Sequence, residues 1–207
     1  KYGLVSFIRL LDIINIVINN ILMLNKDTIY ALATPSGKSA IAVIRISGNN
    51  CGKILNKICN IKKLTPNKTI ITKIYSNKKN KESLDRAMVL YFKKPKSYTG
   101  EDSIEISLHG GPFIIGETIR VLGKTGLCRI AEQGEFTRRA FENNKLNLTQ
   151  AEAVIDLINA ETEIQKKQAY EQLEGKLGSI IIDWTNRIKK ILANVEASID
   201  FGEEDLP

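Results

Sequence analysis

The sequence predicts an α+β fold followed by a segment that is entirely α-helical. From residue 28 to about 143, short apolar runs with the two-residue period of β-strands alternate with runs of helical spacing. After residue 145 only the helical spacing continues. The 207 residues are 43% hydrophobic and 6% aromatic, which is the composition of a globular protein that buries a core.

The first part is expected to contain six strands and three helices. The strands are predicted at residues 28–33, 40–47, 69–75, 87–92, 103–108 and 127–131. The helices are predicted at residues 50–61, 112–124 and 134–143. Pro112 suits the first turn of its helix, because its missing N–H has no partner to lose there. Turn residues at 34–37 predict a connection between the first two strands, and the lysine-rich residues 77–81 predict a loop.

The helical part is expected to contain two long helices. The first begins near Thr149, whose spacing to Glu152 is that of a capping box. Its apolar stripe is predicted to consist of Val154, Ile155, Ile158 and Ile164. The second covers about residues 179–199, after an interruption at Gly175 and Gly178. Two helices cannot bury both apolar faces against each other, so we expect this segment to pack on a further segment or on another subunit.

These patterns divide the chain into three segments. Residues 1–25 are expected to be an extension, non-native or disordered, with translation starting at Met23 or with an organelle transit sequence as the alternative. The apolar run in this segment is interrupted by Asp12 and by Asn residues, so it predicts no membrane span. Residues 26–143 form the α+β domain, and residues 144–207 form the start of a helical domain.

Charge is unevenly distributed along the chain, whose formal net charge is +7. Residues 49–96 hold twelve Lys and one Arg against two acids, a net charge of +11. Residues 146–207 hold twelve acids against six bases, a net charge of −6. The basic stretch is either a surface that faces nucleic acid or a set of solvated lysines. Its lysines are mixed with Ile and Asn, without aromatic residues on which bases could stack.

Several chemistries are not supported by the residues present. The three cysteines lack the paired spacing of a zinc or redox motif, so they are expected to be reduced thiols. With His109 as the single histidine, no metal site is expected. Residues 36–39, Ser-Gly-Lys-Ser, resemble the end of a phosphate-binding loop, but Leu32 stands where that motif needs Gly. We therefore expect a hairpin turn there.

Two charged residues lie inside predicted strands. Strict alternation over residues 103–109 places Glu105 on a polar strand face, where its carboxylate could accept two parallel hydrogen bonds from guanidinium, guanine or a pterin. The alternative is a solvated strand face. Arg45 interrupts an apolar run, so its charge needs a ligand or an internal salt bridge. His109 ends its strand without an identified partner, so no general-base role is assigned to it.

Three longer strings carry a resemblance: DTIYALATPSGKSAIAVIRISG at 27–48, SYTGEDSIEISLHGGP at 97–112 and GEFTRRAFENNKLNLTQAEAVIDLI at 134–158. In this order they resemble the signatures of the MnmE family of tRNA-modifying GTPases. The string ASIDFGEED at 197–205 resembles the family's approach to its GTPase domain. Two local departures occur, TPSGKSA in place of TPPGRGG and Gln133 in place of a proline before GEF.

The resemblance implies that residues 26–143 form a mixed-sheet domain, similar to folate-dependent aminomethyltransferases, that binds a tetrahydrofolate derivative (5-formyl or 5,10-methylene) and forms a homodimer. By motif position, Arg45, Glu105 and Lys145 match the family's folate-contacting residues, and no catalytic or metal-binding residue is assigned. Glu105 would engage the amino and ring N–H groups of the pterin. Arg45 and Lys145 would be cationic contacts.

Full-length members of the family act with the flavoprotein MnmG on tRNA, adding a carboxymethylaminomethyl-type group to carbon-5 of the wobble uridine. They use GTP, Mg²⁺ and K⁺, whose motifs are not in these 207 residues, so this segment alone is not expected to hydrolyse GTP. The implied location is the bacterial cytoplasm, with mitochondria or plastids as the alternative. Two other functions stay open, a basic RNA-binding module with a vestigial folate pocket and a stand-alone one-carbon transferase.

Overall fold

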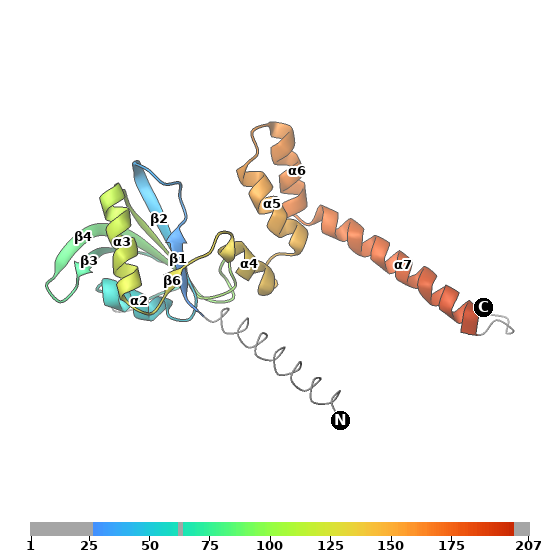
Figure 1. Ribbon diagram of the computed structural model, residues 1–207, viewed down its shortest axis with the longest axis horizontal. Helices are drawn as coiled ribbons and strands as arrows, with labels where there is room; N and C mark the ends of the chain where they lie inside the picture. Colours follow the sequence, from blue (N-terminus) through green and yellow to red (C-terminus); the bar gives the residue numbers. More distant parts are fainter. Residues whose placement is uncertain (1–26, 62–63, 201–207) are drawn as a thin grey trace, which may run out of the picture. The chain divides into compact units, whose positions relative to one another are not determined.

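A computed structural model describes residues 27–61 and 64–200 of the chain (Figure 1). The predicted extension at residues 1–25, the proposed start at Met23 and the end of the string at 197–205 lie outside the described residues. The chain divides into two compact units, one ending at Lys145 and the other beginning at Leu146. Each unit is described by itself.

The first unit is built on one mixed sheet of six strands in the order β3-β4-β5-β2-β1-β6. The strands are β1 (Ile29–Leu32), β2 (Ser39–Ser47), β3 (Thr69–Asn77), β4 (Glu82–Phe92), β5 (Ser103–Gly110) and β6 (Arg129–Ile130). All neighbouring pairs are antiparallel except β1 and β6, which run parallel. The predicted α+β class and mixed sheet are confirmed.

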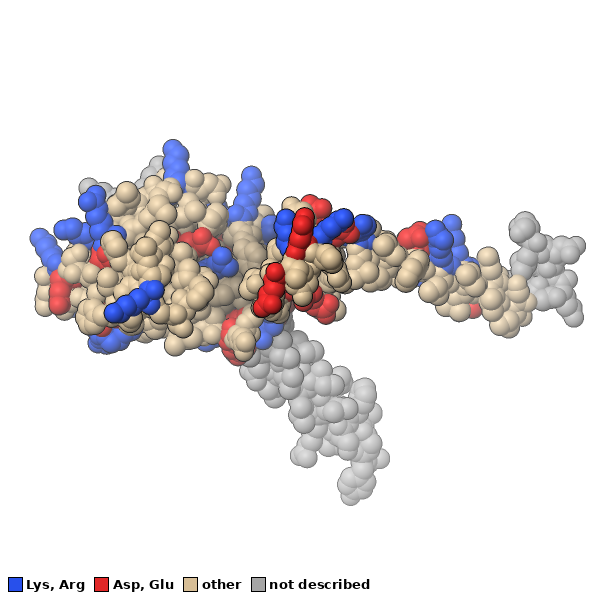
Figure 2. Space-filling view, turned by 90° about the horizontal axis from the view of Figure 1, so that it is seen from above, with Lys and Arg blue, Asp and Glu red and all other residues tan. Residues whose placement is uncertain are grey.

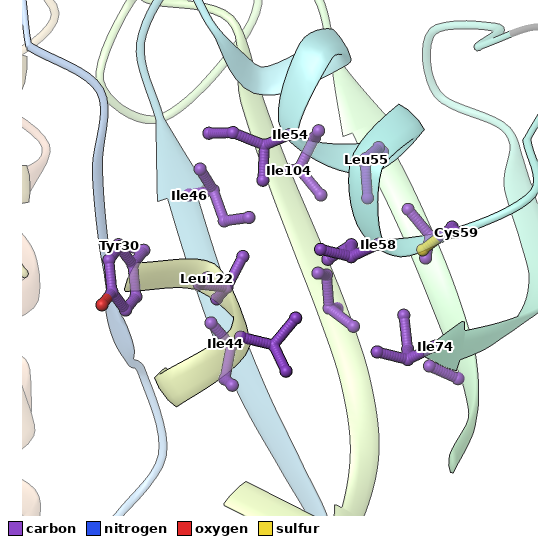
Figure 3. Close-up of a cluster of buried hydrophobic side chains, with 14 of the residues drawn as sticks. Tyr30, Ile44, Ile46, Ile54, Leu55, Ile58, Cys59, Ile74, Ile104 and Leu122 are labelled. Atoms are coloured by element: carbon purple, nitrogen blue, oxygen red, sulfur yellow. The ribbon is translucent and has the colours of Figure 1, made fainter. Parts of the chain in front are cut away.

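One face of the sheet is covered by α2 (Cys51–Ile58) and α3 (Pro112–Lys124). Alternate residues of the central strands point toward these helices, among them Ile44, Ile46, Ile104 and Ile106. Figure 3 shows Ile54, Leu55, Ile58 and Leu122 of the helices packed over them. All of these side chains are at most 2% exposed. Burying each contributes about 1.5 to 3 kcal/mol, so this layer supplies most of the stability of the unit.

In the first unit, the boundaries of two elements differ from the predicted ones by three or more residues. β4 begins at Glu82 instead of Ala87, because β3 and β4 keep pairing through two register shifts as far as Asn77 and Glu82. The first residues of β4 are polar and therefore resemble a loop, but their backbone groups still complete the ladder. α2 ends at Ile58 instead of Ile61, since Cys59 is already extended and bridges to Ile74.

The described residues of the second unit form three helices instead of the predicted two, α5 (Leu148–Ile158), α6 (Glu163–Leu173) and α7 (Lys176–Asp200). The predicted first helix is broken after Asn159. At Thr162 the chain starts again with a capping box, in which the side chain of Thr162 accepts from the backbone of Gln165 and the side chain of Gln165 accepts from the backbone of Thr162. One continuous helix was predicted because apolar residues keep helical spacing on both sides of this break.

The capping box predicted at Thr149 and Glu152 was wrong by two residues. Asn147 is the N-cap of α5, and its side chain accepts a hydrogen bond of 2.8 Å from the backbone N–H of Gln150. The Gln150 side chain in turn accepts from the Asn147 N–H at 2.9 Å. Thr149 instead donates its hydroxyl to the Asn147 side chain. Asn147 with Gln150 and Thr149 with Glu152 have the same spacing, and either pair could satisfy the first N–H groups of a helix, so the sequence alone allowed both starting points.

Large apolar side chains remain exposed on the described helices of the second unit, and the expected packing on a further segment or another subunit stays a prediction. On α7 several large apolar side chains are between 40% and 64% exposed: Leu177, Ile180, Ile181, Trp184, Ile188 and Ile191. None of the helices within the described ranges is long and apolar enough to cross a membrane.

The first unit depends on a tight turn at Gly48, directly after β2. Gly48 has a φ of +131°, and a Cβ there would lie 2.7 Å from Thr28 Cα. We expect Gly48→Ala to lower the free energy of unfolding by about 2 to 4 kcal/mol, from backbone strain and the displaced Thr28 backbone. Urea denaturation followed by circular dichroism measures the change.

Gly116→Ala is the matched control, because a Cβ at Gly116 in α3 would meet nothing within 4 Å. It should raise the free energy of unfolding by about 0.5 to 1 kcal/mol through helix propensity. If both substitutions shift the denaturation midpoint by the same amount and in the same direction, the turn at Gly48 does not constrain the fold as described.

Candidate functional site

The face of the sheet opposite α2 and α3 carries the polar residues of the central strands, and we call it the open face. On β5 the residues Glu105, Ser107 and His109 point to this face, as the alternation predicted. On β2, Arg45 lies directly opposite Glu105 in the antiparallel register. Two charged residues that are sixty positions apart in the sequence therefore become cross-strand neighbours.

Arg45 and Glu105 form an ion pair on the open face. The Arg45 Nε and Nη2 atoms donate to Glu105 Oε1 at 3.0 and 2.8 Å. The two side chains are 26% and 29% exposed, so the pair is partly shielded from water. The internal salt bridge considered for Arg45 is therefore present. Both bonds end on Oε1, and within the described residues no hydrogen bond occupies Oε2, so that oxygen can still accept from a donor.

Two aromatic rings flank the guanidinium of Arg45. Its Cζ lies 5.2 Å from the centre of the Tyr98 ring and 5.7 Å from that of Phe136. Both distances are within the range of a cation–π interaction, and this attraction is stronger when the pair is shielded from water. The Tyr98 hydroxyl and Thr137 Oγ1 are 2.9 Å apart, so the two ring-bearing segments also contact each other. Neither ring is among the predicted site residues, although Tyr98 lies in the string at 97–112 and Phe136 in the string at 134–158.

The segment that carries Phe136 is α4 (Glu135–Glu142), which lies near β1 and β6 (Figure 1). It is attached through Arg139, whose side chain is 1% exposed. Arg139 Nη2 donates to Glu135 Oε1 at 2.9 Å, and Nη1 donates to Glu101 Oε2 at 3.1 Å and to the Asp27 carbonyl at 2.7 Å. A buried arginine thus joins α4 to the loop before β5 and to the start of β1.

The same ion network holds the loop that carries Tyr98. Ser47 at the end of β2 donates its hydroxyl to Glu101 Oε2 at 2.7 Å, and Thr99 Oγ1 lies 2.6 Å from Ser47 Oγ. On the other side, Arg129 in β6 donates to both carboxylate oxygens of Glu135, at 2.7 and 2.9 Å. The network therefore positions both aromatic rings relative to the sheet.

These contacts determine the protonation of Glu135. Burial by itself would raise the pKa of this carboxyl, but hydrogen bonds from Arg129, from the Glu132 N–H and from Arg139 lower it from 4.5 to about 2. The carboxylate is therefore ionised over the physiological range and pairs permanently with the two arginines.

Lys145 lies against the same loop but not against the ion pair. Its Nζ donates to the Pro95 carbonyl at 3.1 Å, and its Cγ lies 3.2 Å from the position of a Cβ on Gly100. Among the described residues it makes no hydrogen bond or ion pair with Arg45 or Glu105. The structure thus brings two of the three predicted site residues into contact and places the third on the loop that holds Tyr98.

His109 has a partner that the sequence did not reveal. The β4–β5 ladder ends at the pair Met88 and Ser107, and beyond it Asp85 replaces the missing backbone acceptor. Asp85 Oδ2 accepts from the His109 N–H at 2.9 Å, and Oδ1 lies 2.8 Å from Nδ1 of the ring. Although burial raises it, the pKa of Asp85 is lowered overall by these hydrogen bonds. No group of three potential metal ligands occurs within the described residues.

Residues 36–39 form the predicted hairpin connection. Residues 36–38 lie between the antiparallel strands β1 and β2, and Ser39 is already the first residue of β2. A phosphate-binding loop needs a helix N-terminus at this point, because the first N–H groups of the helix hold the phosphate.

Comparison with known proteins assigns both units. Residues 28–145 match the family model described as GTP-binding protein TrmE N-terminus, and residues 148–207 match the MnmE helical domain. The chain belongs to the MnmE family. The Arg45–Glu105 pair, both aromatic rings and the ion network of Arg139 all lie in the part that matches the N-terminal MnmE model.

Relatives in the MnmE family come from mitochondria and bacteria. The chain is 47% identical over 178 residues to the mitochondrial 5-taurinomethyluridine tRNA synthase subunit GTPB3 of Homo sapiens, covering 86% of this chain and 36% of that protein. It is 47% identical over 181 residues to the tRNA modification GTPase MnmE of Caulobacter vibrioides, covering 87% and 40% respectively. The MnmE of Aquifex aeolicus is 43% identical over 88% of this chain and 40% of its own length. The chain thus spans well under half of these relatives.

The buried ion network of this MnmE chain should give a defined pH dependence. Because the pKa of Glu135 is lower in the folded chain, its stabilising effect is complete above about pH 4.5 and is lost as the pH falls toward 2. Glu135→Gln, which removes the carboxylate that Arg139 and Arg129 share, should cost about 3 to 5 kcal/mol at neutral pH. The difference in the free energy of unfolding between wild type and variant should become smaller as the pH falls below 4.5.

Urea denaturation of both proteins between neutral pH and about pH 2 measures this difference in the free energy of unfolding. Glu142→Gln is the control on the same helix, because Glu142 is 33% exposed and its nearest partner, Arg138, is 4.0 Å away. Its effect should be below about 1 kcal/mol. A gap for Glu135→Gln that stays constant down to the acid end would show that the carboxylate is not held by the network.

Proposed function

We propose that this chain is the folate-binding part of a tRNA-modifying GTPase, and that its open face binds a tetrahydrofolate derivative, 5-formyl or 5,10-methylene, at Arg45 and Glu105. The observation that carries the proposal is the partly shielded Arg45–Glu105 pair, whose guanidinium lies against two aromatic rings. Membership of the MnmE family supports it, because the chain matches the N-terminal model over 28–145.

The chemistry of the pair suits a pterin. A pterin presents an amino group and a ring N–H side by side, and a carboxylate accepts such a pair of donors in parallel. Arg45 donates to Oε1 of Glu105, and within the described residues Oε2 accepts no hydrogen bond. Tyr98 and Phe136 offer faces for a planar ring. Arg45 and Lys145 serve as cationic contacts to the ligand's oxygens, Lys145 after exchanging its present carbonyl partner.

For the full-length protein we propose the activity named in its relatives, tRNA modification, with a carboxymethylaminomethyl-type group added to carbon-5 of the wobble uridine. The one-carbon unit comes from the folate, the partner is the flavoprotein MnmG, and GTP is hydrolysed with Mg²⁺ and K⁺ outside these residues. The chain acts as a homodimer in the bacterial cytoplasm, with mitochondria or plastids as the alternative, since relatives of both origins match. Alone it does not hydrolyse GTP.

An RNA-binding module is the competing function, based on the basic stretch 49–96. Figure 2 shows Lys and Arg side chains spread over the visible surface of the first unit and not gathered along one groove. This distribution suits solvated lysines better than a track for a phosphate backbone.

We predict that the 207-residue chain binds 5-formyltetrahydrofolate and that Glu105→Ala weakens binding about thirtyfold to a hundredfold. The carboxylate engages two N–H donors in a partly shielded site, which contributes on the order of 2 to 3 kcal/mol. Isothermal titration of the wild type and the variant at two salt concentrations measures the effect.

Lys79→Ala is the matched control, because Lys79 is an exposed residue in the turn between β3 and β4. It should change the folate dissociation constant less than about threefold and less still at high salt. Unchanged folate affinity in a folded Glu105→Ala protein would reject the assigned site. Salt-dependent tRNA binding by a chain that binds no folate would favour the RNA-binding module.

A further inference from the structure

His109 and Asp85 form a hydrogen-bonded pair on the open face, outside the contacts assigned to the pterin. Asp85 Oδ1 lies 2.8 Å from Nδ1 of the ring, and Oδ2 accepts from the His109 backbone N–H at 2.9 Å. Oδ1 also accepts from the backbone N–H of Arg86 at 2.7 Å. The Asp85 side chain is 7% exposed, whereas that of His109 is 70% exposed. A nearly buried carboxylate therefore holds an accessible imidazole by one edge.

This contact determines which ring nitrogen exchanges protons. Burial raises the pKa of Asp85, but hydrogen bonds from His109 and Arg86 lower it overall, so the group is a carboxylate near neutral pH. Because a carboxylate only accepts hydrogen bonds, Nδ1 carries a proton whether the ring is neutral or charged. Proton exchange is left to Nε2, which donates when the ring is protonated and accepts when it is neutral.

The His109 side chain lines a hollow of about 550 Å³ on the open face. Ile41, Ile71 and Met88 give the hollow an apolar floor and are 62%, 64% and 46% exposed. A ligand that covers this floor excludes water from the imidazole. The charged neighbours of the ring are Asp85 and Arg86 of β4, whereas the residue opposite His109 on β2 is Ile41. The hollow thus places a proton-exchanging group beside a ligand-sized space.

The hollow is continuous with the Arg45–Glu105 pair. Glu105, Ser107 and His109 occupy alternate positions of β5 on the same face, so Glu105 and His109 are about 13 Å apart along the strand. The proposed function places the amino edge of the pterin at Glu105. The nitrogens that carry the one-carbon unit of a folate, N5 and N10, lie on the other side of the pterin. A folate that follows β5 therefore presents them toward His109.

We propose that His109 is a catalytic residue that donates a proton from Nε2 to N10 of bound 5,10-methylenetetrahydrofolate, and that Asp85 is its positioning residue. The inference rests on the proposed function, which supplies the folate. As the bond between N10 and the methylene carbon breaks, its electron pair stays on N10 and binds the proton. The positive charge passes from the imidazolium to the methylene group, which remains on N5. No oxidant or reductant is consumed.

Proton donation matters here because an arylamine nitrogen is a poor leaving group until it is protonated. A positioned general acid contributes roughly 10²- to 10⁴-fold to such a step. Asp85 supports it in two ways, by holding the ring through Nδ1 and by stabilising the charge of the imidazolium. The backbone bond to Oδ2 fixes the same residue from its main chain.

The experiment measures the exchange of the methylene group of 5,10-methylenetetrahydrofolate with deuterated formaldehyde under anaerobic conditions, because this exchange requires the N10 bond to open. Mass spectrometry measures the labelled folate. The 207-residue chain should accelerate exchange over protein-free solution, and His109→Gln should lower the protein-dependent rate at least about thirtyfold. The dissociation constant of 5-formyltetrahydrofolate, from isothermal titration, should change less than about twofold, since Glu105 still holds the pterin. Arg86→Gln removes a charge from the same hollow and should lower the rate less than about threefold.

The pH profile separates proton donation from a purely structural role. In wild type the protein-dependent rate should rise as the pH falls from about 8 to about 6, because only the imidazolium donates. His109→Gln should abolish this rise. Asp85→Asn keeps an acceptor for the His109 backbone N–H but removes the charge beside Nδ1. It should lower the rate about tenfold and move the rise to lower pH.

The possible failures are distinguishable. If wild type binds no 5-formyltetrahydrofolate, the proposed function and this inference are both overturned. If wild type binds it but does not accelerate exchange, or if folded His109→Gln exchanges as fast as wild type, only the inference is overturned. Equal losses of affinity and exchange in His109→Gln would make His109 a binding residue and reject proton donation. An unchanged pH profile in Asp85→Asn would reject the positioning role of Asp85.

Discussion

The candidate site depends on the buried ion network around Arg139. Charges removed from water are costly unless each is paired and hydrogen-bonded, and here Arg139 is held by Glu135, Glu101 and a backbone carbonyl. Because the loss of one partner would leave the others buried and unpaired, the network forms as a unit. It fixes α4 and the loop before β5 on the sheet, and these two segments carry the rings of Phe136 and Tyr98.

One face of the sheet forms the hydrophobic core, and the other carries the candidate site. The face under α2 and α3 carries the isoleucines of the central strands and provides stability. Within the first unit, the ion network holds α4 and the loop before β5 near the end of β2, and Tyr98 and Phe136 flank Arg45 on the open face. The open face also carries the partly exposed Arg45–Glu105 pair and exposed apolar side chains. A rigid sheet with side chains locked from behind is well suited to hold binding groups in fixed positions.

Features that follow from local alternation could be predicted from the sequence. The period of two over 103–109 placed Glu105 on the polar face of the sheet. Arg45 was recognised because it is a charged residue inside an otherwise apolar strand. The partner of His109 could not be predicted, because Asp85 is 24 residues away and reaches it only where the β4–β5 ladder ends. The aromatic rings around Arg45 likewise depend on contacts between distant segments. The break between α5 and α6 was not predicted, because the spacing of apolar residues stays helical on both sides of it and carries no information about the N-cap at Thr162.

Charge pairing separates the arginines of the first unit from its lysines. Among the described residues of this unit, the ion pairs involve Arg and His, and no lysine takes part in one. Three lysines donate only to backbone carbonyls: Lys57, Lys78 and Lys145. The planar guanidinium can satisfy several acceptors at once, which suits it to buried networks, whereas a lysine ammonium is more strongly hydrated and stays in water. The large basic excess of residues 49–96 is therefore mostly solvated, and the charges that shape the site are those that are paired.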